Sequence, residues 1–348
     1  MSALRWLGLV LGSGLLLHAF ARFRAARGSR FDFALRLLLA GSLVAVAAVP
    51  SSVDLLRDML MLEREQFSRL IAMLIASSLV LWLVLLATRA RIQRQADHFD
   101  RLVRALGRSE FRRLYPERDR LPSVVVVMPA YEERENIGAV LDAMPAAVCG
   151  LPLGCLVVDD GSRDDTAEVA RRHGALVVST PVQRGGGAAL RLGFDLALEH
   201  GAEIAVTMDA DGQHRPSEIE TLVRPLVESG ASFVIGSRIL GGHEGGSRMR
   251  AAGIHVFNLV IRLLTPVKVT DCSNGFRALR VRDLARVLLR QDQFHTAELI
   301  VDAAKKGIPI AEVPVHVDRR ASGDTKKGRD WSYGLSFART VLKTWWRY

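Results

Sequence analysis

An apolar run leads directly into two aspartates in the stretch Ile204-Ala205-Val206-Thr207-Met208-Asp209-Ala210-Asp211-Gly212-Gln213-His214. A short run of this kind is typical of a strand buried on both faces of a parallel sheet. Ligands bind at the carboxyl ends of such strands. Mg²⁺ and Mn²⁺ prefer carboxylate oxygens and bridge to substrate phosphates. We therefore predict that Asp209 and Asp211 share one such ion, which neutralises a departing diphosphate; an ordinary surface turn is the alternative.

Runs of the same kind recur on both sides of this stretch. The other predicted strands are Ser123–Met128, Cys155–Asp159, Ala175–Ser179 and Ser232–Ile235. The predicted helices are Ile137–Met144, Thr166–His173, Ala188–His200 and Pro216–Ser229. Alternation of strands and helices predicts the α/β class with a mostly parallel sheet.

Polar motifs follow two of the other strands. Tyr131 and Glu132 come after the first strand, where an aromatic ring can stack on a base and a carboxylate can bind a ribose; a capped turn is the alternative. Asp159 and Asp160 end the second strand, and two adjacent carboxylates are costly unless they are hydrogen-bonded or bound to a ligand. Helix capping by Ser162 or Asp164 does not account for that pair.

A glycine-rich segment, Arg184-Gly185-Gly186-Gly187, precedes a predicted helix. Glycines at a helix N-terminus let a phosphate approach, but a flexible turn is the simpler interpretation. The spacing fits neither the phosphate-binding P-loop nor the dinucleotide fingerprint, which argues against kinases and dehydrogenases.

The net charge of +10 does not indicate a nucleic-acid partner. Met1 to Leu121 holds 19 arginines against 10 acidic residues, whereas the rest holds 28 basic against 27 acidic residues. The excess therefore lies beside the most apolar segments, as in membrane proteins. The three cysteines have no metal-type spacing, and their odd number favours a reducing, cytosolic setting.

Three apolar stretches, Trp6–Phe20, Ala34–Val49 and Leu70–Ala87, predict transmembrane helices. The alternative for the first is a signal peptide, because Ala19-Phe20-Ala21 resembles a cleavage site. Arginines crowd the segment 22–30 and the segment after Ala87. The positive-inside rule then puts both in the cytoplasm and the N-terminus outside, with the protein in the inner membrane.

Two further segments are amphipathic. Phe99, Leu102, Val103 and Leu106 have helical spacing among arginines, and the tail Trp331–Tyr348 mixes tryptophans with cations. Both suit the membrane interface, with packing on the soluble domain as the alternative. The expected organisation is three transmembrane helices (1–88), an amphipathic helix and linker (89–121), a catalytic domain (122–330) and an interfacial helix (331–348).

The ordered set MPAYEE, VVDDGSRDDT, MDADGQH, GSR and NGFRALR resembles family 2 glycosyltransferases of the GT-A fold. It is most similar to the branch that makes polyprenol-phosphate sugars, typified by dolichol-phosphate mannosyltransferase. The resemblance covers about Ser123 to Lys327. The preceding region resembles a small uncharacterised membrane domain often found near such enzymes.

The resemblance implies a role for each matching position. The nucleoside-binding residues would be Pro129, Tyr131, Glu132 and Asp160, with Tyr131 against the base, and the metal ligands would be Asp209, Asp211 and Gln213. Phosphates would be bound by Arg238 and Arg250, and by Arg320, Thr325 and Lys326 of a mobile loop. The acceptor-side loop would contribute Asp271, Ser273, Asn274 and Arg277. The residues expected to act in catalysis are Asp211, Arg250, Arg320 and Lys326.

The sequence departs from the family pattern at two places. Ile254 replaces a serine that usually follows the phosphate-binding arginine by four residues. Gln183-Arg184-Gly185 stands where the family has Asn-x-Gly. The first departure puts one acceptor-phosphate contact in doubt.

The predicted acceptor depends on two motifs that were not found in this sequence. Transfer to a hydroxyl normally requires a general base. A phosphate monoester does not, because its second pKa is about 6. The base motif and Gln-x-x-Arg-Trp motif of related polysaccharide synthases do not occur between Ala251 and Tyr348. Cations are frequent instead: Arg238, Arg250, Arg277, Arg319, Arg320, Lys326 and Lys327.

We therefore expect inverting transfer of a hexose from a GDP- or UDP-linked donor to a polyprenyl phosphate, for cell-envelope glycan synthesis. Transfer to a lipid or glycan hydroxyl is the alternative enzyme, and a non-catalytic membrane scaffold is the alternative of another class. The sequence leaves the sugar, the base and a homo-oligomeric state open.

Overall fold

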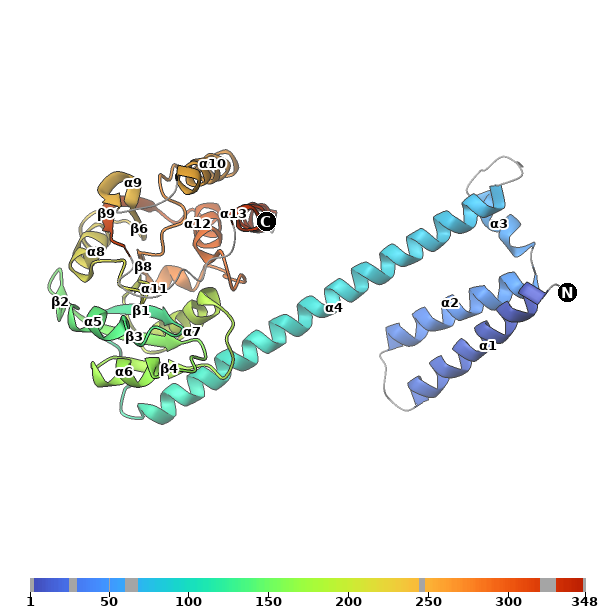
Figure 1. Cartoon of the computed structure of the whole chain (residues 1–348), viewed down its shortest axis with the longest axis horizontal. Coiled ribbons are helices and arrows are strands. Elements are labelled where there is room, and N and C mark those ends of the chain that lie inside the picture. Colours follow the sequence, from blue (N-terminus) through green and yellow to red (C-terminus); the bar gives the residue numbers. More distant parts are fainter. Residues whose placement is uncertain are drawn as a thin grey trace. The chain divides into compact units, whose positions relative to one another are not determined.

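The computed structural model describes residues 3–24, 30–49, 51–59, 68–243, 248–319 and 330–346 (Figure 1). These belong to two compact units, Met1–Ala96 and Asp97–Tyr348, which we describe separately. Helix α4 (Ser68–Leu114) passes through the boundary between them.

The first unit is helical. It contains α1 (Ala3–Arg24), α2 (Arg30–Ala48), α3 (Ser52–Met59) and the first part of α4. Helices α1 and α2 pack together, and Arg5 Nε donates to the Ala47 carbonyl at 3.0 Å. Among the described residues, one helical segment, Met73–Leu114, is long and apolar enough to cross a membrane. Arg5–Phe20 and Phe33–Ala48 are shorter apolar helices, so their crossing of a membrane stays a prediction.

The second unit is built on a mostly parallel sheet, which confirms the predicted fold class. Its strands are β1 (Val124–Ala130), β2 (Ala147–Val148), β3 (Leu151–Asp159), β4 (Leu176–Ser179), β5 (Ile204–Thr207), β6 (Phe233–Ser237), β7 (Gly242–His243), β8 (Arg277–Arg280) and β9 (Ile310–Val317). The order is β4-β3-β1-β5-β8-β6-β9-β7, with β2 paired to the start of β3. Only β2 and β8 run antiparallel to their neighbours among the described strands.

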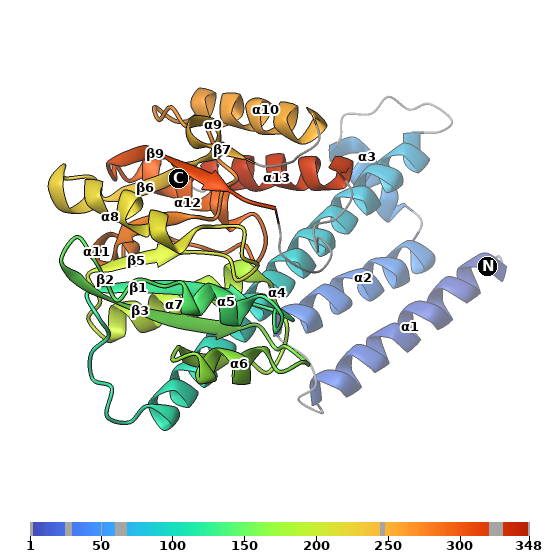
Figure 2. The ribbon, with the colours of Figure 1, turned by 60° about the vertical axis from the view of Figure 1, so that its left-hand side comes forward.

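Helices cover both faces of this sheet (Figures 1 and 2). They are α5 (Ile137–Asp142), α6 (Thr166–Arg172), α7 (Gly186–Glu199), the 3-10 helix η1 (Pro216–Glu218), α8 (Ile219–Glu228), α9 (Arg238–Gly241), α10 (Arg248–Leu264), α11 (Val281–Leu284), α12 (His295–Lys305) and α13 (Asp330–Trp345). Side chains of β1 alternate between two cores. Val124 and Val126 pack with α5, α6 and α8, whereas Val125 and Val127 pack with α7 and α12. Burial on both faces explains the uninterrupted apolar run of this strand.

The end of α4 packs on the second unit. Val103 and Phe111 are buried, and Gly107 lies so close to Leu192 of α7 that a Cβ would come within 2.5 Å of it. Phe99, Leu102 and Leu106 are exposed. Packing on the domain, the alternative to an interfacial position, therefore describes part of this segment. No break separates it from the apolar segment, because α4 is continuous from Ser68 to Leu114.

Helix α13, like the end of α4, has both buried and exposed apolar residues. Phe337 and Val341 are buried, and the Phe337 ring lies 4.1 Å from that of Phe257 in α10. Leu342 and Trp346 are exposed. One face of α13 thus packs on α10 and α12, and the other carries the apolar residues that an interfacial role requires.

Candidate active site

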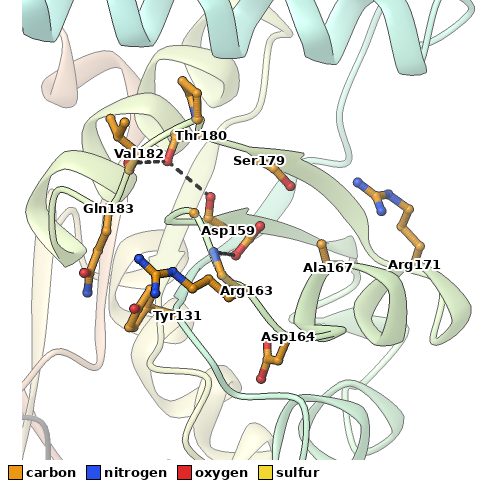
Figure 3. Close-up of a pocket in the computed structure, with 13 residues that line it drawn as sticks. Tyr131, Asp159, Arg163, Asp164, Ala167, Arg171, Ser179, Thr180, Val182 and Gln183 are labelled. Carbon is orange, nitrogen blue, oxygen red and sulfur yellow. Dashed lines mark hydrogen bonds between the residues drawn. The ribbon is translucent and has the colours of Figure 1, made fainter.

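A cavity of about 650 Å³ opens at the carboxyl ends of β1, β3 and β4. Its wall includes Tyr131 after β1, Asp159 at the end of β3 and Gln183 after β4 (Figure 3). Arg163 and Arg171 add two cations to its lining. An aromatic ring, a carboxylate and guanidinium groups around one cavity suit a nucleotide, which offers a base, a ribose and phosphates.

The loop after β1 is held in an unusual conformation. Glu132 has a left-handed backbone, with φ of 52°, and its N–H donates to Ser162 Oγ at 2.9 Å. A hydrogen bond to Glu132 raises the pKa of the Tyr131 hydroxyl. Non-glycine residues in this region of φ are uncommon and gather at functional sites. Pro129 is a residue of β1 itself and does not line the cavity.

The two adjacent aspartates at the end of β3 have different surroundings. Asp159 lines the cavity, and its Oδ1 accepts the Ser162 N–H at 3.0 Å. The Asp160 carboxylate instead accepts the backbone N–H groups of Arg184 at 2.9 Å and Gly185 at 2.5 Å. Burial raises the pKa of Asp160, although these two hydrogen bonds act against that rise. The structure therefore places Asp159 in the cavity wall and Asp160 against the glycine-rich segment, and the role of Asp160 at the nucleoside stays a prediction.

The aspartates after β5 lie beside the start of β8. Thr207 Oγ1 donates to the Gly275 carbonyl at 2.5 Å, which joins the two segments. A Cβ on Gly275 would come within 3.3 Å of both Asp209 carboxylate oxygens, so a glycine leaves this carboxylate room. The Asp209 side chain is 45% exposed, and Asp211 Oδ1 accepts the Gln213 N–H.

Asp209 and Asp211 fit a divalent ion that is shared with a substrate. Among the described residues, no three His, Cys, Asp or Glu side chains gather into a metal site. Mg²⁺ usually uses one or two carboxylates plus substrate phosphates, so two half-buried aspartates at a strand end suffice. The Gln213 side-chain N–H donates to the Asp318 carbonyl at 3.1 Å, and the role of Gln213 as a ligand stays a prediction.

The same loop is joined to the end of β9. The backbones of His214 and Val317 form an isolated bridge, and the Asp318 N–H donates to the Gln213 carbonyl. Arg215 forms two hydrogen bonds to the Asp318 carboxylate, at 2.7 and 2.5 Å. Sequence reasoning missed this ion pair, because no motif in the sequence places the end of β9 beside the loop that follows β5. Arg320, Thr325 and Lys326 follow shortly after but lie outside the described residues, as does the side chain of Arg250.

The predicted acceptor loop surrounds a buried ion pair. Arg238 Nε donates to Asp271 Oδ2 at 2.7 Å, and Arg238 Nη2 donates to Asp271 Oδ1 at 2.9 Å and to Ser273 Oγ at 2.6 Å. Burial alone would raise the pKa of Asp271, but the hydrogen bonds and charge of Arg238 outweigh burial and lower it. The structure thus brings a predicted phosphate ligand and two predicted acceptor residues together.

Two other predicted acceptor residues build the loop from within. Asn274 donates to the Gly236 carbonyl at 2.7 Å. Arg277 is buried, and its guanidinium donates to the carbonyls of Asn274, Cys272 and Thr296. Burial lowers the pKa of Arg277 to about 10. Sequence reasoning counted Arg277 among the cations available to phosphates, whereas its guanidinium is enclosed.

Two supports of this loop were not identified from the sequence. The Glu312 carboxylate of β9 accepts the N–H groups of Thr270 and Asp271. Asn258 of α10 donates to the Thr270 carbonyl and accepts the Cys272 N–H. Glu312 and Asn258 are single polar residues that belong to no recognisable motif, so the sequence did not indicate their role.

The chain is similar in sequence to proteins of known family. Residues 125–288 match the family described as glycosyl transferase family 2. A polyprenol monophosphomannose synthase from Mycolicibacterium smegmatis is 32% identical over 58% of this chain and 80% of its own length. A dolichyl-phosphate hexose transferase from Haloferax volcanii is 32% identical over 63% of this chain and 92% of its own length.

A solved structure is also similar. It is glucosyl-3-phosphoglycerate synthase from Mycobacterium tuberculosis in complex with Mn²⁺, UDP and glucosyl-3-phosphoglycerate. Its sequence is 26% identical, the match covers 68% of this chain and 81% of that chain, and the TM-score is 0.50.

Proposed function

The chain belongs to the family 2 glycosyltransferases and has their GT-A fold, and from this we propose that it transfers a hexose from a GDP- or UDP-linked donor to a polyprenyl phosphate. The reaction takes place at the cytoplasmic face of the inner membrane. The observation that carries the proposal is the similarity to two enzymes named for polyprenol- and dolichyl-phosphate products, at 32% identity over most of their length.

The donor binds with its base and ribose in the cavity beside Tyr131 and Asp159. The ring of Tyr131 stacks on the base, since it lines the cavity and its loop is fixed by the hydrogen bond from Glu132 to Ser162. The Asp159 carboxylate accepts hydrogen bonds from the nucleoside. Mn²⁺ and UDP in the similar solved structure support a nucleotide with a divalent ion.

Asp209 and Asp211 hold Mg²⁺ or Mn²⁺ on the donor diphosphate. The bound ion supplies charge neutralisation as the diphosphate leaves. The residues of this chain orient the reactants. Gly275 leaves room beside Asp209, and the Arg215–Asp318 ion pair fixes the end of β9. Arg320, Thr325 and Lys326 follow β9 in the chain and bind phosphates.

The nucleophile is an oxygen of the acceptor phosphate. It forms a bond to the anomeric carbon as the bond from that carbon to the diphosphate oxygen breaks, and the configuration inverts. A phosphate monoester is largely dianionic at neutral pH, because its second pKa is about 6, so no protein base is needed. Arg250, Arg320 and Lys326 bind this second set of phosphates, since guanidinium groups bind phosphate in a bidentate manner.

The membrane helix supports a lipid acceptor. Segment Met73–Leu114 of α4 includes a charge-free apolar stretch, and exposed Leu342 and Trp346 on α13 suit contact with the membrane surface. A catalytic domain that is tethered in this way meets its acceptor at the membrane rather than in bulk solvent.

The test is to isolate the product. Purified full-length protein in nanodiscs is incubated with Mg²⁺ or Mn²⁺, polyprenyl phosphate and a panel of radiolabelled GDP- and UDP-hexoses. The proposal predicts a lipid-extractable sugar phosphate that is labile to mild acid. Label that enters a lipid product without phosphate, or no lipid product with any donor, contradicts it. An Asp209→Asn variant should form no product.

A further inference from the structure

A cluster of charged side chains lies where the end of α4 meets the glycine-rich segment before α7. We call Asp100, Arg104, Arg184, Arg191 and Asp292 the Asp100 cluster. The Asp100 carboxylate accepts hydrogen bonds from all three arginines: from Arg184 at 2.8 Å, from Arg191 at 2.7 Å and from Arg104 at 2.9 Å. Arg184 and Arg191 also bind Asp292.

Arg184 connects this cluster to the site. Its guanidinium is bound by Asp100 and Asp292 and lies 5.5 Å from the centre of the Phe99 ring. Its backbone N–H donates to the carboxylate of Asp160. One residue therefore binds α4 with its side chain and the end of β3 with its backbone.

The glycines that follow hold the segment against residues 291–292. Gly185 has φ of 107°, and a Cβ there would come within 2.9 Å of the Asp292 carbonyl oxygen. A Cβ on Gly187 would come within 2.2 Å of the Gln291 carbonyl oxygen, and its N–H donates to the Asp292 carbonyl. Only glycine allows this approach, so the segment is a fitted contact rather than the flexible turn that the sequence suggested.

The fitted segment continues into the cavity wall. Val182 and Gln183, which directly precede Arg184, line the cavity, and Asp159 precedes Asp160. Movement of Arg184 would therefore shift both sides of the wall. Arg191 is buried and two other members are largely shielded from solvent: side-chain exposure is 7% for Arg191, 12% for Arg184 and 16% for Asp100. Removing one charged side chain from such a group lowers stability, because the oppositely charged side chains then stay shielded from water without their partner.

The cluster depends on a part of the chain outside the family match. Phe99, Asp100 and Arg104 belong to α4, which precedes the matched residues 125–288.

We propose that Asp100 is a positioning residue for the nucleotide cavity, and that α4 completes this cavity by anchoring the glycine-rich segment through Arg184. This inference rests on the proposed donor site. Asp100 itself does not touch the nucleotide. It fixes the side chain of Arg184. The backbone N–H groups of Arg184 and Gly185 then hold the Asp160 carboxylate, and this keeps Gln183 and Asp159 in place in the cavity wall.

The experiment compares the ion pairs of Asp100 with a second ion pair of α4. Asp100→Asn removes the charge of the anchor with little change of shape. Glu199→Gln removes a second contact of α4, the Arg108–Glu199 pair at 2.6 Å, which lies at the other end of α7. Binding of GDP and UDP with Mn²⁺ is measured by calorimetry on the full chain in detergent. Hydrogen exchange at the amides of Arg184 and Gly185 is measured in the same samples.

Asp100→Asn should weaken nucleotide binding and raise the donor KM by about tenfold, equivalent to about 1.4 kcal/mol, with kcat changed much less. The amides of Arg184 and Gly185 should exchange faster, and Glu199→Gln should change neither. Arg184→Met should behave like Asp100→Asn, and the double variant should be no worse than Arg184→Met, because both remove one anchor.

The inference would be overturned if the wild-type protein binds nucleotide and both Asp100→Asn and Arg184→Met keep its nucleotide affinity and its amide protection. Wild-type protein that binds neither GDP nor UDP would instead contradict the proposed function.

Discussion

Asp159 and Asp160 are adjacent in the chain but have different surroundings in the structure. Asp159 faces the cavity, whereas Asp160 is enclosed by the glycine-rich segment. Asp159 is the last residue of β3, whereas Asp160 begins the loop that follows it, so the two side chains have different neighbours. The sequence showed the pair as a strand-end motif, but the choice between its members requires the position of the next loop.

This difference yields the first prediction. Asp159→Asn should weaken GDP or UDP binding by about tenfold without a change in Tm, because it removes a charge-assisted hydrogen bond to the nucleoside. Asp160→Asn should instead lower Tm, since the amide keeps only one acceptor oxygen, whereas both carboxylate oxygens of Asp160 accept N–H groups from Arg184 and Gly185. Calorimetric titration and thermal unfolding check the two effects. An unchanged affinity in Asp159→Asn would refute its assignment.

The second prediction concerns the metal ligands. Asp211→Asn should fold normally and lose about 10²-fold or more of turnover, because charge neutralisation of a leaving diphosphate contributes several kcal/mol. EDTA should have the same effect on the wild type, and Mn²⁺ should restore it. Glu220→Gln, which changes an exposed carboxylate on α8, serves as the control. Full activity in EDTA would contradict the assignment.

At the scale of elements, the predictable parts are those with long apolar runs. β1, β3, β4, β5 and β6 were located within a few residues because each is buried on both faces. β8 was missed, since only Ala278 and Leu279 are apolar and Arg277 is buried against expectation. Because Arg277 is buried, it is not among the cations available to phosphates, although the sequence analysis included it. Burial of Arg277 depends on three carbonyl oxygens, two from its own loop and one from Thr296 at the start of α12, which no local pattern reveals.

The loop before β8 carries the third prediction. The folded-state pKa of Asp271 lies below its ordinary value of 3.8 because Arg238 stabilises its charge. The resulting stability is fully present above the unfolded pKa and is lost as the pH falls through the lower, folded pKa. Unfolding free energy of the wild type should therefore decrease below pH 4. Asp271→Asn should be less stable at neutral pH and show a weaker decrease, as measured by thermal unfolding; an equally steep decrease would contradict it.

At the scale of the whole molecule, topology is the fourth prediction. The arginines after Ala87 predict a cytoplasmic catalytic domain, and the segment between the second and third apolar stretches is predicted to lie outside. In intact cells, an impermeant thiol reagent should label Ser51→Cys but not Gln93→Cys. Burial raises the pKa of Cys155 and Cys272 to about 12, so these thiols add little background, and Cys149 is replaced by serine. Labelling of Gln93→Cys would refute the topology.

The contact between α4 and the segment that leads to the cavity wall could not be predicted from the sequence. Helical spacing indicated an amphipathic helix before the domain, and packing on the domain was one of two interpretations. The Asp100 cluster joins residues far apart in the chain, and each of its members reads alone as an ordinary surface charge. Only the fold brings them together.

The most direct test of the central claim compares two acceptors that differ by one phosphate. Purified full-length protein with Mn²⁺ and its preferred nucleotide hexose is given polyprenyl phosphate or the matching polyprenol at equal concentration in nanodiscs. Transfer to the phosphate should be faster by about 10² or more, because an alcohol needs a general base that contributes such a factor. Equal or faster transfer to the alcohol would show that such a base exists and would contradict the phosphate acceptor.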